Sequence, residues 1–438
     1  GKFKSFHSPF QFIILIFAFD FLKIMKKLQN IIISTRTTAV LLLLYAFSMA
    51  YATFVENDYG TPTAKALIYE AKWFELIMIL LIINFIGNIA RYRLFRKEKW
   101  PVLMFHLAFV LIFIGGAVTR YISYEGIMPI REGAMSNEII TDKNFFKIQI
   151  EEKGEVLNYK DVPYILASDK PVIAKIIPHN FSANYQFHES KISVKQIEYI
   201  QRKKDSLVVG NGGEEYLHLV STGDAGRKNI YIKSGETKSI NGTLIGFDRA
   251  IEGAVEFKKE NGVLMIKTPV DAEYMTMATQ AKGNTKKDEY QPLVLRSLYT
   301  INDLKLVVPD GLKTGKLLAF EGDKKKDQNL ADALTVSVKG PKTTQNVELS
   351  VEKGNPNAFK QITLDGLNIM LGFGPKVYNT PFSIKLDDFV METYPGSTSP
   401  SAYESHVKII ENGKETPYKI YMNNVLNHGG FRFFQASF

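Results

Sequence analysis

The sequence predicts a membrane protein with three N-terminal transmembrane helices, followed by a large β-rich domain built as an antiparallel sandwich or barrel. Three observations support this prediction. Three segments before residue 120 are long, apolar and almost free of charge. Beyond residue 120, short alternating runs are broken by Gly, Asn and Asp turns, a pattern typical of antiparallel strands. Most of the net charge of +9 falls in the first hundred residues, which carry 13 Lys and Arg against 6 Asp and Glu.

The three spans are expected over residues 37–55, 73–90 and 100–119. The first has no charged residue, the second has only Glu75, and the third has His106 as its one ionisable side chain. A helix of about 20 apolar residues is long enough to cross the ~30 Å hydrocarbon layer of a bilayer. Residues 30–120 are therefore predicted to form the transmembrane domain.

The distribution of charge predicts the orientation of these spans. Lys26–Lys27 and Arg36 precede the first span, and the strongly basic loop 91–99 joins the second span to the third. The segment 56–60 between the first two spans is acidic. Because basic loops stay in the cytoplasm, the N-terminus is expected to be cytoplasmic and residues 121–438 to lie outside. The basic excess is explained in this way and does not indicate nucleic-acid binding.

Residues 9–25 form a further apolar run that Asp20 interrupts. The run is short for a span and fits an interfacial helix or a signal-like segment. Met25, followed by two lysines, resembles a natural start of translation. Residues 1–29 are therefore set apart as an N-terminal extension whose native status is open.

Residues 121–438 are expected to form the extracytoplasmic β domain. A weak similarity between residues 191–201 and 382–392 fits two related lobes, with chance similarity as the alternative. The Gly-rich residues 210–213 are interpreted as a turn between strands, since no helix follows them as in a phosphate-binding loop. The final residues, 427–438, are strand-like to their end, which is interpreted as a C-terminal truncation.

Alternation along that final strand makes a specific prediction. It places Phe431 and Phe433 on one face, with Arg432 and Phe434 on the other.

His106 is the main candidate for chemistry, because a titratable ring is costly inside a membrane. Three explanations are open: a hydrogen bond to a neighbouring helix, a proton relay, or an axial ligand to haem iron. A relay requires further acids, and the spans offer only Glu75, near the opposite face. The balance therefore favours ligation. No other histidine lies in a span, so a second haem ligand must come from another chain or from a missing part of this one.

The other candidate residues do not form a recognisable site. His179, His188, His218, His406 and His428 are not spaced as metal ligands, and no carboxylate cluster accompanies them. The chain has no cysteine, which excludes disulfides, thiolate metal sites and a cysteine nucleophile. No catalytic residue is predicted.

Several motifs together resemble the ResB/CcsB family. They are STRT before the first span, the basic loop, the pattern W-P-x-x-x-x-H-L-A-F in the third span, EGIMPIREG after it, and PFSIKLDDFVMETYPG and GGFRFFQAS near the end. The resemblance is strongest over residues 30–140 and 370–438. This family is the CcsB part of the system II cytochrome c synthase, often fused ahead of CcsA in one polypeptide.

The resemblance implies a component of cytochrome c biogenesis in the bacterial inner membrane, with a periplasmic β domain. It would help to hold haem b and export it for covalent attachment to apocytochrome c. His106 matches the family's transmembrane histidine, an axial ligand to the haem iron, and a CcsA-type partner would supply the second ligand. Because the CcsA-type segments are absent, the chain is not expected to be catalytic alone as part of the holocytochrome c synthase.

Two other functions are open from the residues. One is a membrane-anchored β-domain that acts as a binding or scaffold protein of the envelope, with His106 merely packing. The other is a proton-coupled transporter subunit that uses His106 for protons.

Overall fold

The computed structural model describes residues 23, 25–223 and 226–435. Most of the apolar run at 9–25 lies outside this range, and so does Phe438. The chain divides into two compact units. Unit 1 falls within residues 1–199 and 334–438, and unit 2 comprises residues 200–333. Each unit has its own apolar core and is described separately.

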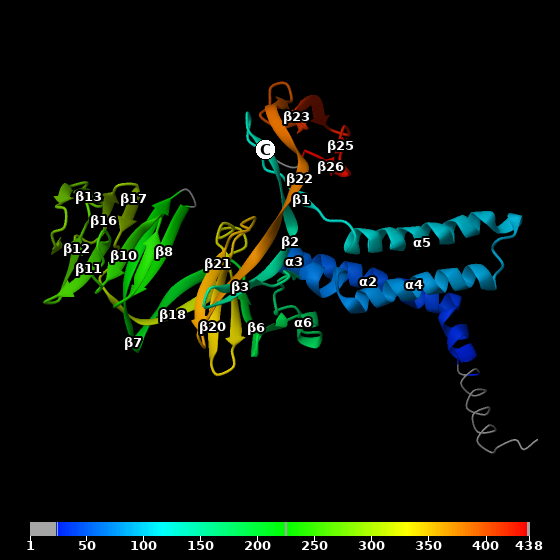
Figure 1. The fold of residues 1–438 in the computed structure, drawn as a ribbon, viewed down its shortest axis with the longest axis horizontal. Helices are drawn as coiled ribbons and strands as arrows, with labels where there is room; N and C mark the ends of the chain where they lie inside the picture. Colours follow the sequence, from blue (N-terminus) through cyan, green and yellow to red (C-terminus); the bar gives the residue numbers. More distant parts are fainter. Residues whose placement is uncertain (1–22, 24, 224–225, 436–438) are drawn as a thin grey trace, which may run out of the picture. The chain divides into compact units, whose positions relative to one another are not determined.

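Three helices of unit 1 are long and apolar enough to cross a membrane: α2 (Thr35–Tyr59), α4 (Lys72–Arg91) and α5 (Trp100–Tyr121) (Figure 1). They coincide with the three predicted spans, which confirms that part of the fold prediction. Helix α2 begins where the Ser34 side chain accepts a hydrogen bond from the Thr37 amide at 3.1 Å. It ends at Gly60, whose φ of 87° favours glycine.

The connection between α2 and α4 is helical rather than an open loop. It contains the short helix α3 (Thr61–Ala64) and the π-helical turn η1 (Lys65–Tyr69), in which Ala66, Leu67 and Ile68 are buried. The residues of the acidic segment 56–59 belong to the last turn of α2, although they interrupt the apolar pattern. The helix continues through them because nothing stops it before Gly60.

Helix α4 is the centre of the helical bundle, with α2 and α5 packed against it. The contact surface is an apolar cluster of Leu41 from α2, Leu81 and Phe85 from α4, and Val110 and Phe113 from α5. Many large apolar side chains on the opposite faces of α2 and α5 are exposed. An exposed apolar surface of this kind is expected where helices face lipid.

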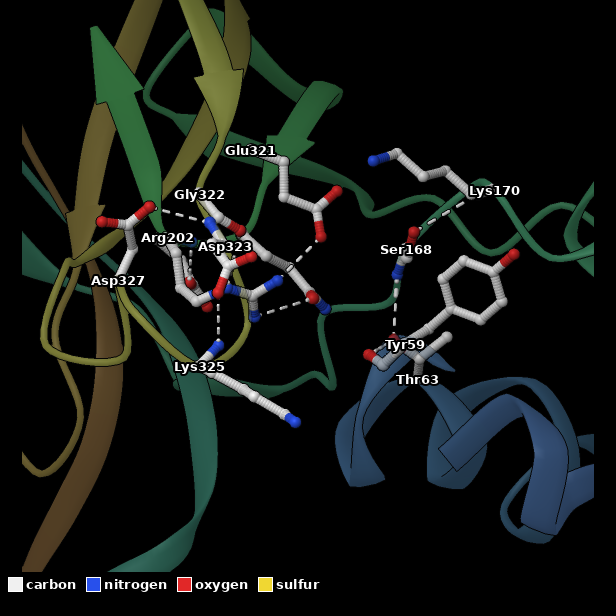
Figure 2. Close-up of polar contacts among 12 residues, drawn as sticks. Tyr59, Thr63, Ser168, Lys170, Arg202, Glu321, Gly322, Asp323, Lys325 and Asp327 are labelled. Carbon is white, nitrogen blue, oxygen red and sulfur yellow. Dashed lines mark hydrogen bonds and ion pairs between the residues drawn. The ribbon is translucent and has the colours of Figure 1, made fainter. Parts of the chain in front are cut away.

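Residues 165–174 cover the ends of α2, α3 and α4 that lie next to the β-rich part of unit 1. Ala167 and Ala174 join Ala52, Val55 and buried residues of η1 in one apolar cluster. The buried Thr63 hydroxyl accepts a hydrogen bond from the Ser168 amide at 3.2 Å and donates to the Tyr59 carbonyl at 3.0 Å (Figure 2). The helices and the β-rich part of unit 1 are thus joined by a shared core and a buried polar contact.

The β-rich part of unit 1 is a sandwich of two main sheets. One has the order β1-β2-β22-β23-β24, with β3, β4 and β21 beside it, and the other has the order β20-β19-β6-β5. Side chains from both sheets, such as Ile150 and Ile192, meet in one core. A small sheet pairs β25 with β26. The bounds are β1 (Gly126–Ile127), β2 (Met135–Glu152), β3 (Glu155–Asn158), β4 (Val162–Pro163), α6 (Val172–Ile176), β5 (Ser182–Phe187), β6 (Ser190–Ile200), β19 (Asp332–Lys339), β20 (Thr344–Val351), β21 (Phe359–Leu364), β22 (Leu367–Thr393), β23 (Pro400–Glu411), β24 (Lys414–Tyr421), β25 (Leu426–His428) and β26 (Phe431–Phe433).

Unit 2 is a second sandwich, inserted between β6 and β19, which are neighbours in their sheet. Its sheets have the orders β15-β12-β11-β10-β9 and β14-β13-β16-β17-β7-β18, with β8 paired to β7. Phe257 and Tyr299, one from each sheet, are fully buried in their common core. The predicted antiparallel sandwich is confirmed, and β10 with β11 forms a parallel pair within it. The bounds are β7 (Lys203–Gly223), β8 (Gly226–Lys233), β9 (Thr237–Ile240), β10 (Thr243–Phe247), β11 (Val255–Glu260), β12 (Val263–Lys267), β13 (Ala272–Thr276), β14 (Lys282–Thr285), β15 (Gln291–Pro292), β16 (Ser297–Ile301), β17 (Leu304–Val307) and β18 (Lys313–Glu321).

Within unit 2, Arg202 ties together the two chain segments where the unit begins and ends. Its guanidinium contacts the Glu321 carboxylate at 2.8 Å and donates to the Gly322 carbonyl at 3.1 Å (Figure 2). Its backbone amide donates to the Asp332 side chain at 2.6 Å. All of these partners belong to unit 2, so Arg202 has a structural role where the chain enters and leaves this unit.

Two local predictions have opposite outcomes. The interpretation of residues 210–213 as a turn between strands is wrong, because they lie within β7, where its pairing with β18 is interrupted between Val209 and Glu215. Gly213 is needed there, since a Cβ would lie 2.3 Å from the Gly315 carbonyl oxygen. The predicted alternation at the end of the chain is confirmed. Phe431 and Phe433 pack against the buried Phe382, whereas Arg432 and Phe434 are exposed.

Candidate functional site

His106 lies in the first half of α5, on the face that packs toward α4. It shares this face with Leu103, Val110 and Phe113, which follow the three- and four-residue spacing of a helical stripe and are all buried. The imidazole itself is half-buried. The sequence thus places His106 at the edge of the α4–α5 contact rather than on the fully exposed side of the helix.

Two aromatic rings contact the imidazole. The Phe85 ring of α4 meets it edge-on with a centroid distance of 5.5 Å, and the Phe105 ring lies 6.1 Å away in a similar orientation. Phe109 stacks on Phe85 at 5.3 Å. These contacts restrict the orientation of the His106 ring and keep its surroundings apolar.

One hydrogen bond determines which nitrogen of the ring carries the proton. The Nδ1 atom lies 2.8 Å from the Val102 carbonyl oxygen, one turn earlier in α5. A carbonyl oxygen can only accept, so Nδ1 donates its proton and the neutral ring has a lone pair on Nε2. Among the described residues, Nε2 has no hydrogen-bond partner. Metal-ligating histidines typically donate their second N–H to a carbonyl or carboxylate in this way.

Glu75, the only acid in the predicted spans, lies at the other end of α4. It pairs with Lys72 at 2.9 Å and with Arg120 at 3.7 Å, and it accepts a hydrogen bond from the Tyr121 hydroxyl. Ten residues of helix separate Glu75 from Phe85, which corresponds to about 15 Å. Glu75 is therefore part of an ion-pair cluster between α4 and α5, and it is not within reach of the His106 ring.

The histidines of the β-rich part have separate, local partners. His179 stacks on Tyr164 at 4.8 Å, and its Nε2 bonds the Ile165 carbonyl at 2.9 Å. Burial lowers the pKa of His179, and the bond to Ile165 partly offsets this shift. Within the described ranges, no three His, Asp or Glu residues are grouped so that they could hold a metal ion. The remaining histidines pair individually: His188 with Glu155, His218 with Asn229, His406 with Glu404, and His428 with Glu411.

The fold defines a membrane protein with three apolar helices and a β-rich region that contains two sandwiches. Residues 255–438 match the ResB-like family. The resemblance predicted from the sequence motifs is thereby confirmed, and the matched range includes all of β22 to β26. His106 lies outside the matched range.

A known protein is similar to nearly the whole chain. Protein NrfI of Wolinella succinogenes is 25% identical over 414 residues, which are 94% of this chain and 31% of that relative. The chain therefore spans about a third of the length of the relative that it matches. The similarity extends well beyond residues 255–438, so it includes much of the N-terminal region as well.

Proposed function

We propose that this chain is a CcsB-type component of a system II cytochrome c biogenesis machine, in which His106 is one axial ligand to haem held inside the membrane. The observation that carries the proposal is the hydrogen bond from Nδ1 to the Val102 carbonyl, which leaves Nε2 with a lone pair and no partner in the described part of the chain. Neutral imidazole nitrogen is a common axial ligand of haem iron. The ResB-like match and the similarity to NrfI support this function.

The residues around His106 fit a haem cargo. Phe85 and Phe105 supply apolar ring surfaces next to the imidazole, and the exposed Val102 and Phe105 side chains continue this surface. A flat macrocycle with an apolar body can bury itself against such a surface. The role of the chain is to orient the imidazole and to keep water away from the ligating nitrogen. It does not supply the thioether chemistry.

A second axial ligand is required for a six-coordinate haem. The described helices contain no histidine other than His106. A CcsA-type partner, separate or in the same polypeptide, would supply the second ligand and would present the haem to apocytochrome c. The proposed site is therefore shared, and this chain would not attach haem alone.

The orientation of the chain follows from its charge. With the basic residues 91–99 on the cytoplasmic side of a bacterial inner membrane, the β-rich part lies in the periplasm. His106 is six residues from Trp100, or about 9 Å along the helix axis. The ring would then lie in the inner half of the bilayer, where haem from the cytoplasm first reaches the protein.

The test is the substitution His106→Ala in the chain expressed together with its CcsA-type partner. We expect loss of the haem Soret band from the purified complex, and recovery of the band when free imidazole is added. His218→Ala is the matched control, because that histidine lies on β7 and stacks on Tyr231. It should leave the haem content unchanged.

Unchanged haem content in the His106→Ala complex would contradict the proposal. A complex without haem in every partner combination would favour an envelope scaffold. Transport activity that depends on a proton gradient, without a Soret band, would favour a transporter subunit.

A further inference from the structure

A groove of about 620 Å³ lies on the β-rich part of unit 1. Segments far apart in the sequence line it: Lys147 of β2, Tyr159 and Asp161 after β3, Phe359 of β21, and Lys376 with Tyr378 of β22. Its volume is within the range of small-molecule sites, which is roughly 300–1,000 Å³. None of these residues contacts His106, so the groove is a separate feature.

The charges that line the groove do not balance. Its charged lining residues are two lysines and one aspartate. The Lys376 ammonium pairs with the Asp161 carboxylate at 3.0 Å. Lys147 donates to the carbonyls of Pro356 at 2.8 Å and Pro375 at 2.7 Å. An ammonium group has three N–H donors, so these two bonds leave Lys147 one donor and a full positive charge.

The environment of Lys147 adds to this imbalance. Burial lowers the pKa of Lys147, the nearby Lys376 lowers it further, and Asp161 partly offsets both effects. A cation that is partly desolvated and close to a second cation is stabilised when an anion binds beside it. The groove therefore favours a negatively charged ligand.

An aromatic ring lies beside each of the two lysines of the groove. The Phe359 ring lies 5.6 Å from the Lys147 ammonium, and the Phe145 ring lies 4.5 Å from that of Lys376. Tyr159 and Tyr378 also line the groove. Flat apolar surfaces next to cations suit a ligand that has a flat apolar body and an acidic group.

One side of the groove borders the part of β2 that contacts the helices. The pairing of β2 with β22 is interrupted at residues 141–143, opposite Lys376, whose amide donates to the Thr141 hydroxyl at 2.9 Å. The same interruption contacts the helices. Asp142 pairs with Lys65 of η1 at 3.3 Å, and the Lys143 ammonium donates to the Arg120 carbonyl of α5 at 3.2 Å.

A second contact also brings the groove close to the helices. The Tyr378 ring, which lines the groove, lies 5.1 Å from the ring of Tyr124. Tyr124 is three residues beyond the end of α5, so the chain between them spans about 10 Å at most. One side of the groove is therefore close to the end of α5, where that helix would leave the membrane.

We propose that this groove binds a small amphiphilic carboxylate with a flat apolar body, which reaches it from the membrane surface. The carboxylate would contact the Lys147 and Lys376 ammonium groups, and the flat body would lie against Phe359 and the two tyrosines. This site would function whether or not His106 ligates haem.

The test compares two probes of the same shape and different charge, 2-naphthoate and 2-naphthamide. Binding is measured by isothermal titration calorimetry on the full chain in lipid nanodiscs, with empty nanodiscs as the blank. We expect the acid to bind at least tenfold more tightly than the amide. Equal affinities, or no binding of the acid at millimolar concentration, would overturn the proposal.

Three variants test the residues themselves. Lys376→Gln should weaken binding of the acid about tenfold, whereas Asp161→Asn should strengthen it, because it frees Lys376 from its ion pair. Lys385→Gln is the matched control: Lys385 is on β22 and pairs with Asp387 at 3.2 Å, but it does not line the groove. Lys147 is left intact because it holds two carbonyls. Weaker binding in Asp161→Asn, or equal losses in Lys376→Gln and Lys385→Gln, would contradict the assignment.

Discussion

The two ends of the α4–α5 pair each hold an ionisable group, and the two groups differ in how many partners they have within the chain. At the end next to the β-rich part, Glu75 is bound by Lys72, Arg120 and Tyr121. At the end next to the loop 91–99, the His106 ring has one bond, to its own helix, and a second nitrogen without a partner among the described residues. Both groups are costly in a membrane. Only the first has its cost offset within the chain.

This difference separates a structural group from a candidate ligand. A charged group whose hydrogen bonds are satisfied internally stabilises the contact between helices, and its removal weakens the fold. A ring nitrogen that the protein orients but does not hydrogen-bond, such as Nε2 of His106, is free to bind a ligand that is not part of this chain. The comparison predicts that substitutions around Glu75 lower stability without changing the haem content. His106→Ala should remove haem and leave the stability unchanged.

The largest effect on stability is expected from Arg120→Met. The Arg120 side chain is 15% exposed, contacts Glu75, and donates to the Glu70 carbonyl. Its loss leaves the Glu75 carboxylate less well paired, although Lys72 and Tyr121 still contact it, which costs about 1–3 kcal/mol. We expect the thermal unfolding midpoint in detergent to fall by several degrees, with the haem content per folded protein unchanged.

Lys72→Met is the control for that variant. Lys72 also pairs with Glu75, but its side chain is 81% exposed. It should change the midpoint little. If the two variants had equal effects, or if Arg120→Met removed haem, the two ends of the helix pair would not be functionally separate.

A smaller effect is expected from Asn84→Leu, near the His106 end of α4. The Asn84 side chain is fully buried, and it donates to the carbonyls of Ile32 and Ser34 and accepts from the Thr38 hydroxyl. Leucine would remove these bonds, and the Ile32 carbonyl would lose its side-chain donor, at a cost of about 1–2 kcal/mol. The Ser34 carbonyl would keep the Thr38 amide and hydroxyl as donors. The unfolding midpoint should fall while the Soret band remains, because the polar contacts of Asn84 are all internal.

Asn88→Leu provides the comparison for Asn84→Leu. Asn88 is also buried on α4, but its side-chain oxygen has no partner in the described part of the chain. Its replacement removes a group whose desolvation is not fully offset, so the loss of stability should be smaller. A larger loss than in Asn84→Leu would show that the hydrogen bonds at Ile32 and Ser34 contribute little.

The transmembrane part could be predicted from the sequence because about 20 consecutive residues with almost no charge strongly indicate a membrane-spanning helix. The bounds of α2 were less accurate, since its start depends on the Ser34 cap and its end on Gly60 rather than on hydropathy. His106 was found because it is the one titratable group in its span. Its tautomer could not be predicted, because it depends on the distance from Nδ1 to a carbonyl.

The groove could not be predicted from the sequence. Lys147 and Lys376 are far apart along the chain, and the pairing of β2 with β22 brings them together. Neither lysine belongs to a motif, and each alternates with apolar neighbours as on any sandwich strand. The insertion of unit 2 between β6 and β19 was equally hidden, because both units are built from strands of similar length and composition.

The smallest effect concerns His179, which lies in the β-rich part of unit 1 and is stacked on Tyr164. Burial lowers its pKa below the usual value of about 6.5, so the folded state keeps the ring neutral. Below about pH 6.5 the unfolded chain binds a proton that the folded chain does not, so the free energy of unfolding decreases as the pH falls from 7 toward 5. In His179→Gln this part of the decrease should disappear, while the carboxylates, which titrate at lower pH, contribute equally to both proteins. Unfolding midpoints measured every half unit between pH 5 and 7.5 provide the comparison, and parallel curves for the two proteins would show that His179 is not held neutral by the fold.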